Sequence, residues 1–215
     1  MSFKTNQEAV VAAASKHLGK VGGEGYSDQY NPELLVKIPR YLNREGYGLT
    51  GEEFKGVDVW NCYEVSAITK KGQPVAGMLK IVCPSDTEFH VESKSIKLYL
   101  NSLNMTPMGV TAKECINKIE ETVSKDLTEL LGGPVTCSFF SDDLSPEFAF
   151  KGFTDLKISA DLDALEFTAF QSDASQLKIA TESPNAVEMK VSSNLLRSNC
   201  RVTNQPDWGD VFIQI

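Results

Sequence analysis

The sequence lacks long hydrophobic runs. No apolar stretch approaches the ~20 residues that a membrane-spanning helix requires, and residues 1–16 lack the apolar core of a secretory signal. These absences exclude the common kinds of membrane insertion and export. We therefore expect a cytoplasmic protein with no membrane partner.

Metal-ligating residues are also scarce. The 215 residues include two histidines, His17 and His90, and five cysteines, none of them in a CxxC pair. This pattern fits neither a zinc site nor a disulfide framework, so we expect no metal. An odd number of thiols indicates small core residues, or one reactive thiol among inert ones.

Positive charge is the third deficit. The 21 Lys and Arg residues against 29 Asp and Glu residues give a formal net charge of -8. A surface of this charge repels a phosphate backbone, which argues against direct binding of nucleic acid. What is present, 41% hydrophobic and 23% charged residues, is typical of a folded globular protein with one or two cores.

The order of hydrophobic patterns predicts an α+β chain. Residues 57–69 and 75–83 are β-rich runs joined by a connection short enough for a hairpin. Two helices are expected at residues 93–103 and 111–131, and Gly132-Gly133-Pro134 should stop the second. Further strands are expected at residues 135–140, 164–170, 187–193 and 210–215.

This order divides the chain into three parts. Residues 1–55 are punctuated by glycine and proline after a short helix at 7–17, and should form an irregular arm. Residues 56–134 contain one complete ββαα module. Residues 135–215 supply the strands of a second module that stops before its helices. A terminal apolar strand without covering helices is expected to drive self-association.

Cys200 differs from the other cysteines by its polar, turn-like surroundings at residues 198–209. The other four lie in predicted strands or on an apolar helix stripe, where small core residues are typical. A nucleophilic thiol needs a cation, a helix N-terminus or a carboxylate nearby, and Asp207 is the nearest carboxylate in sequence. A turn containing Pro206 could bring Asp207 back to exchange protons. The structural alternatives are an inert thiol and a turn-capping aspartate.

The start of the helix at 93–103 is a second candidate site. Ser93 should cap this helix, and Lys94 and Lys97 place two cations on one exposed face beside its N-terminus, an arrangement that suits phosphate. Glu92 could accept hydrogen bonds from the amidine-like edge of a purine. The structural alternatives are solvated lysines and a helix-dipole carboxylate, since no GxGxxG or Walker A loop supports a nucleotide site.

These two segments carry a resemblance to a known family. Residues 92–99, ESKSIKLY, resemble the NADPH motif of the 7-cyano-7-deazaguanine reductases, the nitrile reductases of queuosine biosynthesis. Residues 198–209 are similar to that family's nucleophile and acid segment, with the same Cys-to-Asp spacing. Segments 28–44 and 56–64 also resemble its long, two-module form, in a similarity that runs from about residue 18 to residue 215.

The resemblance implies a tunnelling-type fold, in which ββαα modules with helices on one face of an antiparallel sheet assemble into a homodimer or higher homo-oligomer. It also implies NADPH-dependent reduction of the nitrile of 7-cyano-7-deazaguanine to the aminomethyl base, through a cysteine thioimide. Cys200 would be the nucleophile, Asp207 the proton donor and Glu92 the base-recognition carboxylate. The residues for NADPH would be Ser93, Lys94 and Lys97.

One departure from the family pattern concerns the C-terminal end. The long form continues into two further helices with a histidine-glutamate pair, and neither His17 nor His90 stands in such a motif. We therefore expect a truncated chain, or a partner polypeptide that supplies those helices, and little activity of this chain alone. The alternative function is a non-catalytic assembly or purine/pterin-binding module of the same fold. A cysteine hydrolase is disfavoured, because no histidine lies near Cys200 in sequence.

Overall fold

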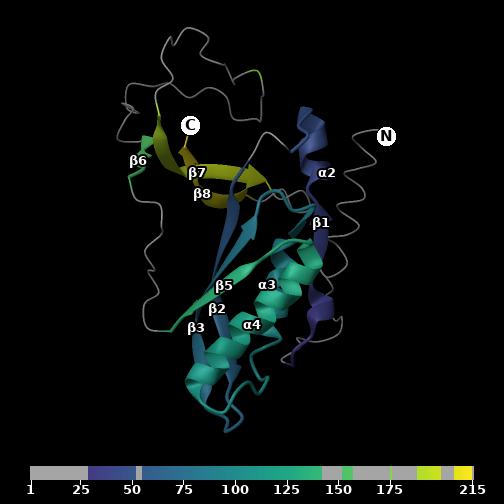
Figure 1. The fold of residues 1–215 in the computed structure, drawn as a ribbon, viewed down its shortest axis with the longest axis vertical. Coiled ribbons are helices and arrows are strands. Elements are labelled where there is room, and N and C mark those ends of the chain that lie inside the picture. Colours follow the sequence, from purple (N-terminus) through teal and green to yellow (C-terminus); the bar gives the residue numbers. More distant parts are fainter. Residues whose placement is uncertain are drawn as a thin grey trace. The chain divides into compact units, whose positions relative to one another are not determined.

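The structure is a computed structural model, and it describes residues 29–51, 55–141, 152–156, 175, 188–199 and 206–214. The chain divides into two compact units, Met1–Pro146 and Glu147–Ile215. Figure 1 shows the elements of each unit along the sequence. Both helices and sheets are present, and most strand pairs are antiparallel, which confirms the α+β class.

The first unit is built on a three-stranded antiparallel sheet. β2 (Val57–Ile68) and β3 (Pro74–Pro84) form the predicted hairpin, and β5 (Thr136–Phe140) pairs with β3 along its other edge. We had expected the strand at 135–140 to begin the second module. The structure instead places it in the first sheet, because its residues pair with Met78–Val82.

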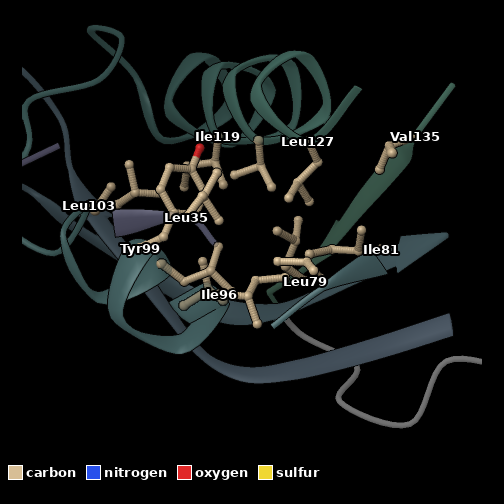
Figure 2. Close-up of a cluster of buried hydrophobic side chains, with 14 of the residues drawn as sticks. Leu35, Leu79, Ile81, Ile96, Tyr99, Leu103, Ile119, Leu127 and Val135 are labelled. Carbon is tan, nitrogen blue, oxygen red and sulfur yellow. The ribbon is translucent and has the colours of Figure 1, made fainter. Parts of the chain in front are cut away.

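Two helices cover this sheet. α3 (Ser93–Asn101) contacts β2, and α4 (Ala112–Leu131) contacts β3 and β5. Both helices begin and end close to the predicted boundaries. Figure 2 shows the core between the two layers, where side chains of both helices point toward those of β3. Leu79 and Ile81 of β3 and Ile119 and Leu127 of α4 are among the side chains that are 0% exposed. Burying an aliphatic side chain this completely contributes about 1.5–3 kcal/mol, so this layer holds the unit together.

The ends of α4 follow the local signals in the sequence. Thr111 caps its N-terminus by accepting a hydrogen bond from the Glu114 amide at 3.2 Å, and the Glu114 carboxylate accepts one from the Val110 amide at 2.8 Å. The helix ends at Gly132, whose φ of 73° lies in the left-handed region that favours glycine. The predicted stop at Gly132 is therefore confirmed.

The described part of the N-terminal arm packs onto the first unit. β1 (Lys37–Pro39) pairs antiparallel with β4 (Phe89–Val91), the strand that leads into α3. The remaining short elements of the arm are η1 (Pro32–Leu34), α2 (Tyr41–Arg44) and η2 (Glu45–Tyr47).

Two arginines fasten the arm to the turn between β3 and β4. The Arg40 guanidinium pairs with the Asp58 carboxylate at 2.5 Å and donates to the Thr87 hydroxyl at 3.2 Å. Arg44 donates to the Ser85 carbonyl at 2.9 Å. Because the Arg40 side chain is only 11% exposed, its ion pair is partly shielded from water. The arm therefore holds the turn that precedes β4 and α3.

The second unit contains β6 (Thr154–Asp155), β7 (Lys190–Asn199) and β8 (Pro206–Gln214) among the described residues. β7 and β8 form an antiparallel hairpin. They overlap the strands predicted at 187–193 and 210–215, but both extend into the segment 198–209 that was expected to be turn-like, because Ser198 and Asn199 pair with Asp207 and Pro206. β6 runs parallel to β7, so this short pairing departs from the antiparallel expectation. The strand expected at 164–170 and the helix expected at 7–17 lie outside the described residues.

The hairpins of the two units share a local pattern. Each first strand contains one register shift. The residue after the shift, Val65 in β2 and Leu196 in β7, faces a glycine on the second strand, Gly77 or Gly209. Each second strand begins at the proline of a Gln-Pro dipeptide. The shared register shows that the two hairpins have equivalent strand pairing. No repeated pattern in the sequence indicated this equivalence.

Candidate functional site

Glu92, and not Ser93, caps α3. The Glu92 carboxylate accepts hydrogen bonds from two helix amides, that of Lys94 at 3.0 Å and that of Ser95 at 2.6 Å. Ser93 is the first helical residue, and its hydroxyl donates to the same carboxylate at 3.4 Å. The predicted Ser93 cap is therefore wrong, because the longer side chain one residue earlier reaches the amides that a serine would have bonded.

This capping changes how an anion can bind at the start of α3. The amides of Lys94 and Ser95 are already bonded to Glu92, and its negative charge offsets the positive end of the helix dipole. A phosphate here would therefore be bound by side chains, and the bare helix N-terminus expected from sequence is not available. The carboxylate has about four acceptor positions and keeps part of that capacity for a ligand.

Lys94 and Lys97 lie on the exposed side of α3, as expected. The Lys97 ammonium is 3.0 Å from the Glu64 carboxylate of β2, with side chains 53% and 72% exposed. An ion pair this exposed contributes at most about 1 kcal/mol. Lys97 can therefore exchange Glu64 for a ligand phosphate at little cost, and Glu64 becomes a competitor for the same cation.

The buried hydroxyl of Ser95, next to Glu92, joins the arm to α3. Ser95 is 0% exposed, and its Oγ donates to the Glu92 carbonyl at 2.8 Å while accepting from the Val36 amide at 3.0 Å. The Glu92 amide in turn donates to the Val36 carbonyl at 2.8 Å. Sequence reasoning missed Ser95. The available signal was a serine one position before Ile96, on the same helical stripe as Tyr99.

Two tyrosines of the first unit share one carboxylate. Asp126 of α4 accepts from the Tyr99 hydroxyl at 2.6 Å and from the Tyr30 hydroxyl at 2.8 Å. Burial and the bond to Asp126 raise the pKa of Tyr30 to about 12, and the same two causes raise the pKa of Tyr99 still further. Both hydroxyls stay protonated at neutral pH and act as donors. The network therefore links the arm, α3 and α4.

The four described thiols lie in or against the core of the first unit, as their positions predicted. Burial raises the pKa of Cys62 to about 12, that of Cys83 to about 11 and that of Cys137 to about 12. Burial also raises the pKa of Cys115. Because the thiolate is the nucleophile, thiols with raised pKa values are unreactive at neutral pH.

The predicted nucleophile segment falls at one end of the second hairpin. Cys200 lies outside the described residues and directly follows Asn199, the last residue of β7. Asp207 lies in β8, where its backbone pairs with that of Ser198. The hairpin thus places Asp207 on the strand opposite the residue two positions before Cys200.

The structure thus groups four of the six predicted site residues. Glu92, Ser93, Lys94 and Lys97 meet at the start of α3 in the first unit, whereas Cys200 and Asp207 belong to the second. Among the described residues, no group of three or more His, Cys, Asp and Glu side chains is placed to hold a metal ion. No described helix is long and apolar enough to cross a membrane.

Comparison with known proteins agrees with these motifs. Residues 26–139 match the family model described as nitrile reductase, 7-cyano-7-deazaguanine-reductase N-term. The chain is 37% identical over 191 residues to proteins of Rickettsia akari (strain Hartford) and Rickettsia massiliae (strain Mtu5), each named NADPH-dependent 7-cyano-7-deazaguanine reductase. The Rickettsia prowazekii (strain Madrid E) protein of the same name is 36% identical over 191 residues.

Each of these three alignments covers 88% of this chain and 66% of the relative. The chain therefore spans just under two thirds of the length of the curated relatives that it matches. The family model matches more than half of the chain, from the arm through β5. On this match and these identities, the chain belongs to the 7-cyano-7-deazaguanine reductase family of nitrile reductases.

Proposed function

We propose that this chain acts in the NADPH-dependent reduction of the nitrile of 7-cyano-7-deazaguanine to the aminomethyl base, in queuosine biosynthesis. The observation that carries the proposal is the start of α3, where a carboxylate with remaining acceptor capacity lies beside two exposed cations. Glu92 suits the donor edge of a deazaguanine, and Lys94 and Lys97 suit phosphates. The net charge of -8 favours the free base over RNA as substrate.

Cys200 and Asp207 supply the covalent chemistry in this proposal. The Cys200 thiolate forms a bond to the electrophilic nitrile carbon, one C–N π bond breaks, and Asp207 gives a proton to the nitrogen. The product is a thioimide with a C=N bond. NADPH would supply two hydrides to this carbon, each balanced by a proton taken up at the nitrogen. The first reduces the C=N bond, the Cys200 thiolate then leaves to give an imine, and the second reduces the imine to the aminomethyl group. The four described cysteines are unsuited to this role because burial or partial burial raises the pKa of each thiol.

The chemistry is tested by intact-mass analysis of the chain incubated with 7-cyano-7-deazaguanine. We expect one covalent adduct, absent from Cys200→Ala and retained by Cys115→Ala, which removes a buried thiol of the core. Asp207→Asn should slow the adduct's formation by impairing proton delivery. An adduct that persists in Cys200→Ala would remove this cysteine from the mechanism.

The α3 surface fits the phosphates of NADPH through its side chains. Ser93, Lys94 and Lys97 are exposed. Lys97 would leave its exposed ion pair with Glu64, and the Ser93 hydroxyl would leave its long hydrogen bond to Glu92 at 3.4 Å. Lys97→Ala should weaken NADPH binding about fivefold or more and lessen its salt dependence. The matched control is Lys118→Ala, which also removes an exposed lysine from an ion pair, on α4. Equal affinity for NADPH and NADH, measured by fluorescence titration, would contradict this assignment.

For the fold we propose tunnelling-type modules that assemble into a homo-oligomer. The support is the ββαα order of β2, β3, α3 and α4, together with the equivalent hairpin of the second unit. Among the described residues, β2 and β5 are the outer strands of the sheet, and apart from one bridge between Ile68 of β2 and Pro107 each pairs with β3 alone. Such edges suit strand pairing between subunits. Size-exclusion chromatography with light scattering should show a dimer or larger species. A monomer at micromolar concentration would contradict assembly.

A non-catalytic purine- or pterin-binding module is the second candidate. It is favoured by one observation, that Glu92 and both lysines lie within the first unit, apart in sequence from Cys200. This function requires Glu92 and does not require the thiol. Reversible binding of the base, with no adduct by mass and no loss of affinity in Cys200→Ala, would select it over the reductase.

A further inference from the structure

Two buried serines join the arm to α3, one at each end of the helix. Ser95 and Ser102 are both 0% exposed. Ser95 accepts a hydrogen bond from the Val36 amide at 3.0 Å, and Ser102 accepts one from the Asn31 amide at 3.1 Å. Each hydroxyl also donates to a backbone carbonyl of the helix region. The two contacts are chemically alike, and they differ in what the serine touches.

Ser95 touches the backbone and the side chain of Glu92. Its hydroxyl donates to the Glu92 carbonyl at 2.8 Å, and its amide donates to the Glu92 carboxylate at 2.6 Å. The Ser102 hydroxyl donates instead to the Tyr99 carbonyl at 2.6 Å, at the far end of the helix. Of the two serines, therefore, only Ser95 connects the arm with the candidate binding carboxylate.

The contacts around Ser95 form a closed ring of hydrogen bonds. Val36 donates to Ser95, Ser95 donates to Glu92, and the Glu92 amide donates back to the Val36 carbonyl at 2.8 Å. Each member is thereby fixed by two neighbours. The ring holds the backbone from which the carboxylate projects, while two helix amides hold the carboxylate itself.

We propose that Ser95 is a positioning residue for Glu92, and that it couples the docking of the arm to the orientation of the carboxylate that binds the base. This rests on the proposed function of Glu92 as the base-recognition group. A carboxylate selects a donor edge by the direction of its remaining lone pairs, so a small rotation of the carboxylate weakens its bonding to the base. The exposed lysines project from α3 without contacting the ring, so cofactor binding does not depend on it.

The experiment compares Ser95→Ala with Ser102→Ala in the full chain. Both variants remove one buried hydroxyl and leave one arm amide without its acceptor, so both should lower the free energy of unfolding by similar amounts. Binding of 7-cyano-7-deazaguanine and of NADPH is measured by calorimetry, with Glu92→Gln as the reference for loss of the carboxylate. We expect the Kd for the base to rise about tenfold in Ser95→Ala and less than about twofold in Ser102→Ala.

The Kd for NADPH should change less than about twofold in both serine variants. A general loosening of the fold would instead weaken the binding of both ligands. Should Ser95→Ala fail to fold, Ser95→Cys keeps a similar volume and a weak donor, and an intermediate rise in the Kd for the base is expected. Base affinity that is unchanged in Ser95→Ala or Ser95→Cys, but lost in Glu92→Gln, overturns the positioning role alone. Unchanged affinity in Glu92→Gln overturns the proposed function with it.

Discussion

Asp126 is the residue whose loss should most weaken the docking of the arm on the helical layer. It accepts hydrogen bonds from Tyr99 and Tyr30, whose rings meet edge to face with centroids 6.3 Å apart. Asp126→Ala leaves both hydroxyls without this acceptor. Because Tyr99 is 0% exposed, water cannot readily replace the lost partner of its hydroxyl.

The cost follows from the burial of each donor. A hydrogen bond from a buried hydroxyl to a carboxylate contributes about 1.5–3 kcal/mol, which applies to Tyr99. Tyr30 is 39% exposed, so water competes for its hydroxyl and its bond should contribute about 0.5–1 kcal/mol. Asp126→Ala should therefore lower the free energy of unfolding of the first unit by about 3 kcal/mol, and Asp126→Asn by about half as much.

The measurement is urea unfolding followed by circular dichroism at 222 nm, because α3 and α4 are the longest helices among the described residues. Glu129→Ala is the control, since it removes an exposed carboxylate of α4 whose ion pair spans 4.0 Å. In a double-mutant cycle, Tyr99→Phe and Asp126→Ala should couple by more than about 1 kcal/mol. Additive effects, or a loss for Asp126→Ala as small as that of the control, would refute the reasoning.

Three further predictions concern the first unit. Native-state alkylation at pH 7.5 should leave Cys83 and the other buried thiols unlabelled, and labelling at the rate of a free thiol would contradict their burial. The pKa of Tyr30 is raised from an ordinary 10 to about 12 in the folded protein, so the protonated hydroxyl contributes its full stabilisation below pH 10. Urea unfolding measured at a series of pH values should show the free energy of unfolding falling between pH 10 and 12. Gly77→Ala should lower the free energy of unfolding by more than about 2 kcal/mol, because the added Cβ would lie 2.3 Å from the Phe140 carbonyl oxygen. Gly209→Ala, whose added Cβ would have its nearest contact at 3.8 Å, should lower it by less in the same unfolding assay.

Local patterns in the sequence predicted most elements of the first unit. The apolar stripe of α4 and the stop at Gly132 are signals carried by neighbouring residues, so they do not depend on the rest of the chain. The β2–β3 hairpin was predicted for the same reason. The cap of α3 was missed because serine is the more frequent cap, and only the folded backbone shows that Glu92 reaches the same amides.

Contacts between distant residues were beyond the reach of local patterns. The arm was predicted as irregular from its glycines and prolines, yet its described part pairs with β4 and bonds to Ser95. The strand after α4 was assigned to the second module because it follows a helix, whereas tertiary pairing with β3 decides its place. The local sequence of a strand does not determine which other strand it pairs with.

In the proposed function, the motif at residues 92–99 binds a ligand with one side of the helix and docks the helix with the other, because the helical period places alternate groups of residues on opposite sides. Positions on the outward side, Ser93, Lys94 and Lys97, are exposed and free of the core, which leaves them to a ligand. Positions on the inward side dock the helix: Ser95 on the arm, and Tyr99 on Asp126 of α4. The two sets depend on docking to different degrees. The hydrogen bonds of Ser95 hold Glu92 itself, whereas the long, exposed lysine side chains can follow a bound phosphate through a small shift of the helix. An interpretation of the motif that considers only its cofactor residues therefore omits the buried half that holds Glu92.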